Sequence, residues 1–343
     1  MRMACAIAQG GESAWWLFAL RFFSARSCTG HIFHCRLRPF FLQLIASVIV
    51  GNIGCMKNPK SFIASAESID FNGLPAVRLT TPDGASAVIT LYGAQLVSWL
   101  SADGRERLYL SEKARFESGR TIRGGIPVIF PQFADNGSLP RHGFARTSIW
   151  ELVNARHEKN YACATLRLTD SEATRVLWPH AFVAELTVMI EGNRLDVEFE
   201  VENTGDEAFS FTAALHSYFS VAKANSCQLQ GLDGVCYLDK VDGGNLKRED
   251  GETMLLDEEV DRVYLDVSKP LLLWEPARHL AIESEGFPDV VVWNPWIDKC
   301  AALDDMPPDG YRQMICIEAA AVARPVELAP GELWSGRQTA ISL

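Results

Sequence analysis

Apolar and polar residues alternate along much of the chain after residue 56, with the period of two that is typical of β-strands. The clearest case is the segment RLDVEFEVE at residues 194–202. Its apolar positions share one face: Leu195, Val197, Phe199 and Val201. The Gly192-Asn193 pair just before it predicts a hairpin turn with residues 181–190 as the partner strand. We therefore expect a half-buried strand paired with the segment that precedes it.

Other short apolar runs, separated by turn residues, extend this pattern to the end of the chain. They predict strands at residues 86–92, 94–100, 107–110, 162–168, 209–215, 235–238, 271–274, 280–284, 290–293, 314–319 and 338–343. Helical periodicity is weak throughout, and strands do not alternate regularly with helices. The pattern indicates an all-β protein, with residues 56–343 forming one large antiparallel sandwich domain.

Residues 1–55 differ from the rest of the chain and are not expected to belong to this fold. They contain five arginines, no lysine and one acidic residue, and show no sustained period. Arg36 and Arg38 precede an apolar run at residues 40–50, as in a signal peptide, and the scarcity of acids also fits a transit peptide. Gly54-Cys55 is weakly similar to a lipoprotein cleavage site. We favour upstream sequence read in frame before a start at Met56, with targeting or tethering as the alternative.

Composition narrows the class of protein. With 343 residues, 48% of them hydrophobic, the chain can bury a substantial core. Its formal charge of −11 argues against nucleic acid or an anionic membrane surface as a partner of the main domain. The cysteines after residue 56 are irregularly spaced and form no C-x-x-C pair, which predicts reduced thiols and no zinc site. We expect a cytoplasmic monomer.

Cationic residues gather in a glycine- and proline-rich segment at residues 121–150, which contains Arg123, Arg141, His142 and Arg146. Glycine and proline interrupt any regular period, so these side chains are expected on loops. The arginine fork forms paired, charge-assisted hydrogen bonds with phosphate or carboxylate. In so acidic a chain the segment predicts an anion-binding site. The alternative is that the arginines neutralise carboxylates on the surface.

Two predicted strands carry a titratable residue at a position suited to chemistry. In FSFTAALH, residues 209–216, bulky side chains take one face and small ones the other, which leaves His216 with room for a ligand. In QMICIEAA, Glu318 shares a face with Met314 and Cys316, where burial would raise its pKa and suit it to general-base work. The alternatives are a histidine bonded to a backbone carbonyl and a glutamate in a structural ion pair.

Six segments resemble a known family in their sequence and order. They are RGGIPVIFPQF, LPRHGFAR, ALHSYF, EVDRVYL, VVWNPW and CIEAA. They are similar to the aldose 1-epimerases, or mutarotases, and most of all to the branch that acts on hexose 6-phosphates. The resemblance runs from residue 68 to residue 343. It implies a galactose mutarotase-like β-supersandwich, no metal or organic cofactor, and exchange between the α and β anomers of a sugar phosphate, with glucose 6-phosphate expected.

The resemblance also implies roles for individual residues. His216 would be the catalytic histidine and Glu318 the catalytic glutamate. The positions that would bind substrate are Arg123, Arg141, His142, Arg146 and Asp261, the last as a ligand for a sugar hydroxyl. Arg141 departs from the family pattern, in which a neutral residue is common at that position.

The chemistry of anomer exchange fits these residue types. A base must take the proton of the C1 hydroxyl and an acid must protonate the ring oxygen, so one carboxylate and one imidazole suffice. We expect Glu318 to act as the base and His216 as the acid when the ring opens. One alternative is a silent sugar-phosphate-binding or regulatory protein on the same fold. Another is a polysaccharide-acting enzyme, for which the sequence shows no flanking carboxylate pair.

Overall fold

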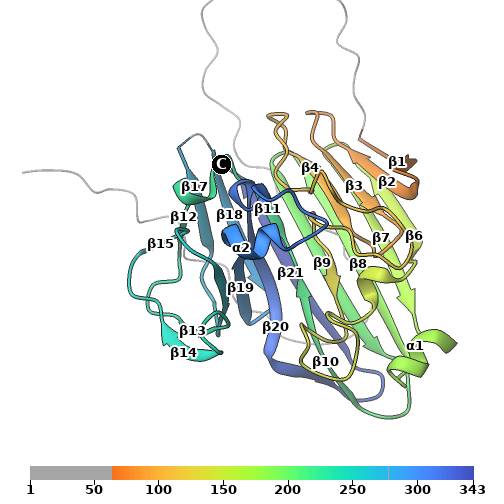
Figure 1. Cartoon of the computed structure of the whole chain (residues 1–343). Coiled ribbons are helices and arrows are strands. Elements are labelled where there is room, and N and C mark those ends of the chain that lie inside the picture. The colour runs from red at the N-terminus through yellow and green to blue at the C-terminus, as the bar shows by residue number, and fades with distance from the viewer. Residues whose placement is uncertain (1–63, 277) are drawn as a thin grey trace, which may run out of the picture. The chain divides into compact units, whose positions relative to one another are not determined.

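The computed structural model describes residues 64–276 and 278–343. The expectations for residues 1–55, and for a domain boundary at residue 56, lie outside the described residues. All pairings between the named strands are antiparallel, and they build three sheets. The expected large antiparallel sandwich is confirmed (Figure 1). None of the helices in the described residues is long and apolar enough to cross a membrane.

Consecutive strands build the four-stranded sheet, whereas the other two sheets combine strands from distant parts of the chain. The four-stranded sheet has the order β1 (Ser65–Phe71), β2 (Leu74–Thr80), β3 (Ser86–Thr90) and β4 (Leu96–Leu100). The eight-stranded sheet has the order β14 (Asn245–Arg248), β13 (Cys236–Asp239), β16 (Val260–Tyr264), β19 (Asp289–Asn294), β20 (Met314–Leu328), β10 (Phe209–Leu215) and β5 (Val128–Ile129), and β11 (Tyr218–Ser220) also pairs with β20.

The third sheet has nine strands. Its order is β15 (Thr253–Leu255), β12 (Gln228–Gln230), β17 (Leu271–Glu275), β18 (Arg278–Glu285), β21 (Leu333–Ser342), β9 (Arg194–Asn203), β8 (Phe182–Glu191), β7 (Tyr161–Thr169) and β6 (Glu151–His157). The helical segments are short: η1 (Ala145–Thr147), α1 (Glu172–Leu177), η2 (Ala224–Ser226), α2 (Trp296–Ala301) and η3 (Gly310–Gln313).

Period-two alternation explains how β9 contributes to the core. Its apolar residues are almost completely buried: Leu195, Val197, Phe199 and Val201. On the opposite face Asp196 is also buried, because it accepts a hydrogen bond from Thr339 of β21 and pairs with Arg194. The strand prediction is confirmed, but its polar face is more covered than a half-buried strand implies.

Other predicted strands differ in their extent. Residues 107–110 form only isolated bridges, Leu108 to Phe219 and Leu110 to Gly124, so the predicted strand there is wrong. The chain makes single contacts with two different segments at that point and cannot continue a ladder with either. The prediction at residues 314–319 was too short, because β20 runs from Met314 to Leu328. It leads into β21, which belongs to the nine-stranded sheet (Figure 1).

The two faces of β20 serve different purposes. Ile315, Ile317 and Ala319 lie in the large core that the eight- and nine-stranded sheets share. Residues between them face away from this core, since successive side chains alternate across a strand. Cys316 and Glu318 are among them and are fully buried nonetheless. The outer face of the eight-stranded sheet is therefore the place to look for a site.

Candidate functional site

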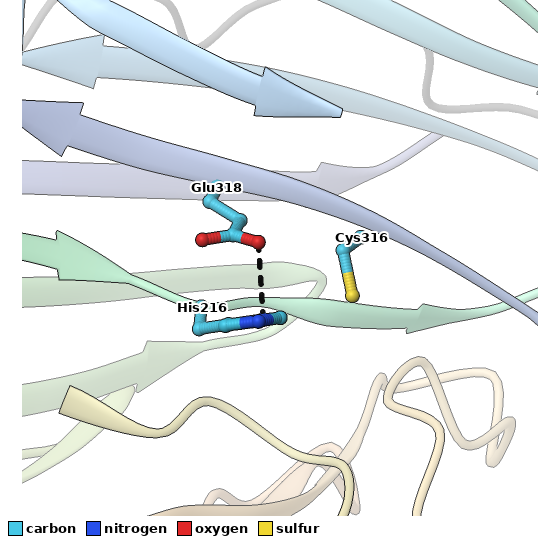
Figure 2. Close-up of side chains that lie close together, drawn as sticks. All are labelled: His216, Cys316 and Glu318. Atoms are coloured by element: carbon cyan, nitrogen blue, oxygen red, sulfur yellow. Dashed lines mark ion pairs between the residues drawn. The ribbon is translucent and has the colours of Figure 1, made fainter. Parts of the chain in front are cut away.

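The register of β20 brings His216 and Glu318 together. Tyr218 of β11 pairs with Cys316 of β20. In an antiparallel pair, the residue two positions back on one strand lies opposite the residue two positions forward on the other, so His216 lies opposite Glu318. The Nδ1 atom of His216 is 3.2 Å from Oε1 of Glu318 (Figure 2). Sequence analysis predicted both residues, and the fold makes them neighbours.

The carboxyl group of Glu318 is almost completely enclosed. Its side chain is 1% exposed, and Oε2 has no hydrogen-bond partner among the described residues. On the same strand, Cys316 lies in an apolar cluster with Tyr218 and Met314, and Ala320 lies in a second cluster. A buried carboxyl group with unused hydrogen-bonding capacity is costly, and such a group calls for a functional explanation.

Burial shifts the pKa of both members of the pair toward their neutral forms. It raises the pKa of Glu318 well above its usual value, and the charge of Asp261 adds to that shift. It lowers the pKa of His216, and the nearby His142 and Arg146 act in the same direction. The 3.2 Å contact lacks the angles of a hydrogen bond, since Nδ1 has no such partner in the described structure. Both shifts favour the neutral forms, a protonated carboxyl group and an imidazole with one unprotonated nitrogen, and groups of these two kinds can exchange protons with a ligand.

Several contacts hold the imidazole of His216 in place. Its backbone N–H donates to the carbonyl of Pro127 at 3.0 Å. Its ring stacks on Tyr218 with 4.7 Å between centroids and an angle of 7° between planes. The ring of Trp293 lies nearly perpendicular to it, with 6.0 Å between centroids and an angle of 83° between planes. These contacts leave little freedom for the ring and favour a fixed distance to Glu318.

A buried amide ties together the strands that carry the pair. Gln338 of β21 donates through Nε2 to the carbonyl of Ile317 at 3.0 Å and accepts from the hydroxyl of Ser217 at 2.5 Å. Ser217 follows His216 in sequence, and Ile317 precedes Glu318. The backbone N–H of Ile317 also donates to the carbonyl of Ser217 at 3.1 Å. Gln338 thus fixes the separation of the two strands next to the site.

Arg123 lies close to the pair, but its charge is already matched. Its Nε donates to Asp305 at 3.1 Å, and one of its terminal nitrogens donates to the hydroxyl of Tyr218 at 3.0 Å. These two contacts, together with the ring stacking of Tyr218, link Arg123 to His216 through one intervening side chain. Arg123 is therefore positioned both to orient Tyr218 and to meet a ligand.

Arg146 is a different kind of cation. It lies in η1, and a terminal nitrogen donates to the backbone carbonyl of Arg141 at 2.9 Å. Among the described residues no carboxylate forms an ion pair with Arg146. Burial lowers its pKa to about 10, and Arg123 and Arg141 act in the same direction. A partly buried guanidinium without an acidic partner among the described residues is suited to hold an anionic ligand.

Arg141 and His142 occupy the loop before η1. The side chain of Arg141 is 61% exposed and pairs with Asp135, so its carbonyl is the part that supports Arg146. His142 is buried with φ of +68°, and its Nδ1 accepts from the N–H of Ala134 at 3.2 Å. Burial lowers the pKa of His142 to about 2. The ring is therefore neutral, and Nε2 carries its donor hydrogen.

Asp261 approaches the pair from the neighbouring strands. It pairs in register with Trp293 of β19, which pairs with Cys316 of β20. Burial raises the pKa of Asp261, and Lys299, whose Nζ is 3.9 Å away, opposes that shift. A carboxylate in this position can accept hydrogen bonds from a sugar hydroxyl.

A cavity of about 680 Å³ lies elsewhere, and its lining includes Tyr109, Glu112, Asp309 and Gln313. Neither His216 nor Glu318 lines it. The candidate site is therefore defined by the buried acid–base pair and the unpaired cation, and not by that cavity.

A protein-family model matches the part of the chain that carries these residues. The aldose 1-epimerase model matches residues 75–340, which is most of the chain and contains every site residue named above. The chain belongs to the aldose 1-epimerase family. As a member of that family it is an enzyme that interconverts anomers at C1 of an aldose.

Similar proteins support the assignment of this aldose 1-epimerase. A Cenchrus ciliaris protein named for glucose-6-phosphate 1-epimerase activity is 37% identical over 276 residues, covering 78% of this chain and 84% of that protein. An Escherichia coli K12 protein of the same name is 34% identical over 238 residues, covering 68% and 79%. The crystal structure of a Salmonella typhimurium protein named as a mutarotase matches with a TM-score of 0.74 at 30% identity, covering 82% of this chain and 93% of that one.

Three residues that sequence analysis missed belong to the candidate site. Tyr218 stacks on His216 and binds Arg123, and its position two residues after His216 on alternating backbone could have indicated a shared face. Asp305 pairs with Arg123 from a segment 182 residues away in the sequence, and no local sequence pattern predicts that contact. Lys299 in α2 is likewise placed near Asp261 only by the fold.

Replacing Glu318 with Gln is expected to stabilise the epimerase increasingly as pH rises. The pKa of Glu318 is raised in the folded state. Its contribution to the free energy of unfolding is therefore fully present below the unfolded-state pKa of about 4.3, and it is lost as the pH rises from there to the folded-state pKa. Gln has nearly the same shape and does not ionise. Thermal unfolding from about pH 5 upward should show a widening gain, reaching about 1–3 kcal/mol. Glu327→Gln, an exposed site on the same strand, is the control; a gain independent of pH would contradict the assignment.

Proposed function

We propose that this aldose 1-epimerase interconverts the α and β anomers of a hexose 6-phosphate, with His216 and Glu318 as the catalytic pair. The observation that carries the proposal is a buried imidazole 3.2 Å from a buried carboxyl group. Close to this pair lies a cation, Arg146, that forms no ion pair with any carboxylate of residues 64–276 and 278–343. The two similar proteins named for activity on glucose 6-phosphate support that sugar as the substrate.

The carboxyl group and the imidazole together can supply and accept the protons that the reaction moves. Burial favours the neutral carboxyl form of Glu318. Starting from that form, transfer of its proton to Nδ1 of His216 gives a carboxylate and an imidazolium after a small rotation of either group. The carboxylate then takes the proton of the C1 hydroxyl while Nε2 of the imidazolium protonates the ring oxygen. The open aldehyde turns about its C1–C2 bond, and closure on the other face reverses both transfers. Each transfer contributes roughly 10²–10⁴-fold.

Cationic residues on the loops select the phosphate in this proposal. Arg146 offers a guanidinium that no carboxylate in the described part of the chain occupies. Arg123 can offer the N–H groups that its contact with Asp305 leaves free. The carboxylate of Asp261 orients a sugar hydroxyl, and the Nε2–H of His142 is a second donor. The negative charge of the chain as a whole makes this local positive charge necessary for an anionic substrate.

The proposal is tested by following fresh α-glucose 6-phosphate toward its anomeric equilibrium by NMR with and without the protein. We expect acceleration in proportion to protein concentration. A silent sugar-phosphate binder would show ligand binding by calorimetry with no acceleration.

We place the enzyme in the cytoplasm, because all five cysteines in the described residues are free thiols.

A further inference from the structure

A thiol completes a compact group of possible metal ligands beside the catalytic pair. Cys316 lies two residues before Glu318 on β20, so the two side chains share a face. Ligand atoms of His216, Cys316 and Glu318 all lie within 4.8 Å of one another. Figure 2 shows the thiol and the carboxyl group extending from one strand, with the imidazole across from them.

The spacing suits a cation with tetrahedral coordination. Zinc bonds of about 2.0–2.3 Å place neighbouring ligand atoms about 3.3–3.6 Å apart. The His216–Glu318 contact of 3.2 Å is already close to that value. The Sγ atom of Cys316 lies within 4.8 Å of the other two ligand atoms, so binding requires its side chain to turn toward them. Thiolate, imidazole and carboxylate are all zinc ligands, and three protein ligands leave a fourth position for water.

Unused bonding capacity at these atoms also points to a ligand. Nδ1 of His216 and Oε2 of Glu318 are buried without a hydrogen-bond partner in the described residues. As whole residues, His216 is 9% exposed and Glu318 is 1% exposed. A dication bound by a thiolate and a carboxylate is formally neutral, and a buried site tolerates that state far better than a net charge. The cation of Arg146 opposes binding, so affinity should fall below that of a structural zinc site.

We infer that His216, Cys316 and Glu318 form an inhibitory site for Zn²⁺ and for the softer Cd²⁺. The metal takes the lone pairs that the proton transfers need, so the bound form cannot catalyse. The inhibition rests on the proposed function, whereas the binding does not. Because the ligands must be deprotonated, binding releases the proton of the Cys316 thiol and that of the Glu318 carboxyl when it is present. Affinity therefore rises with pH.

The test uses the full chain, with Cd²⁺ and Zn²⁺ alone as probes. Cd²⁺ titration should produce a thiolate charge-transfer absorption that saturates at one ion per chain, and Zn²⁺ should displace it. Calorimetry in buffers of different ionisation enthalpy should show release of one to two protons. Cys316→Ala should weaken binding at least about 100-fold, since even residues that only support metal ligands are worth about 10–100-fold. Cys316→Val, which fills the space of the sulfur with an apolar group, replaces it if the alanine variant does not fold.

Cys236→Ala is the matched control, because Cys236 is the exposed thiol among the described cysteines. It should leave the saturable absorption intact. Zn²⁺ should abolish anomer exchange by wild type and spare Cys316→Ala, and a chelator should restore activity. The inference is overturned if the absorption is absent, or if it persists equally in Cys316→Ala and Cys316→Val. One-to-one binding through Cys316 in a protein that never accelerates exchange would sustain the metal site and defeat the proposed function alone.

Discussion

Glu318→Gln and His216→Asn are each expected to lower kcat for anomer exchange by about 10²–10⁴-fold, or about 3–5 kcal/mol of transition-state stabilisation. Gln and Asn keep approximately the shape and polarity of the original side chains but cannot exchange a proton. The remaining member of the pair cannot take over the lost proton transfer, because it lies on the opposite strand. The double variant should be little slower than the slower single variant, because the two residues act as a unit. The measurement is exchange of glucose 6-phosphate at saturating concentration.

Binding by the same variants provides the control for this result. Because neither substitution removes Arg146, the affinity for the sugar phosphate should change much less than kcat. Glu327→Gln, on the exposed part of β20, should behave as wild type. Single variants that retain wild-type turnover would contradict the catalytic assignment, even if the protein proved to be an epimerase.

Arg146→Ala is expected to raise KM for a hexose 6-phosphate by about 10- to 150-fold, the value of one hydrogen bond to a charged group. The phosphate does not react, so its contacts are equal in the ground and transition states and kcat should change less. Arg146 also affects the pKa values of His216 and Glu318, but that effect is the same for any substrate. The ratio of kcat/KM for hexose 6-phosphate to that for free hexose therefore isolates the phosphate contact.

Arg141→Ala is the matched comparison on the same loop. Its side chain is largely exposed and already paired with Asp135, and alanine keeps the carbonyl that supports Arg146. We expect a much smaller change in the ratio. Equal losses for phosphorylated and free sugars in Arg146→Ala would remove the basis for placing the phosphate at this cation.

The parts of the fold that the sequence predicts are those in which burial depends on local alternation. Strand β9 can be predicted from the sequence because its apolar side chains are all buried in one core. β1 is not, since most of its residues are only partly buried and show no alternation. Residues 107–110 have the composition of a strand, but hydrogen bonding to two separate partners prevents a ladder.

The candidate site shows the same division. His216 and Glu318 are recognisable from their strand faces, but their opposition depends on the register between β11 and β20, which lie about 100 residues apart in the sequence. A period of two indicates which face a residue occupies, and it does not indicate which distant residue lies opposite. For the same reason the sequence predicts the same role for Arg123 and Arg146. In the structure, Asp305 pairs with Arg123 and not with Arg146.

The central claim is that the buried pair of His216 and Glu318 exchanges the anomers of a hexose 6-phosphate, and two-dimensional NMR exchange spectroscopy on glucose 6-phosphate at equilibrium tests it most directly. We predict cross-peaks between the α and β C1 signals that grow with wild-type protein and are close to the buffer level with Glu318→Gln or His216→Asn. Wild-type cross-peaks no larger than those in buffer would contradict the claim.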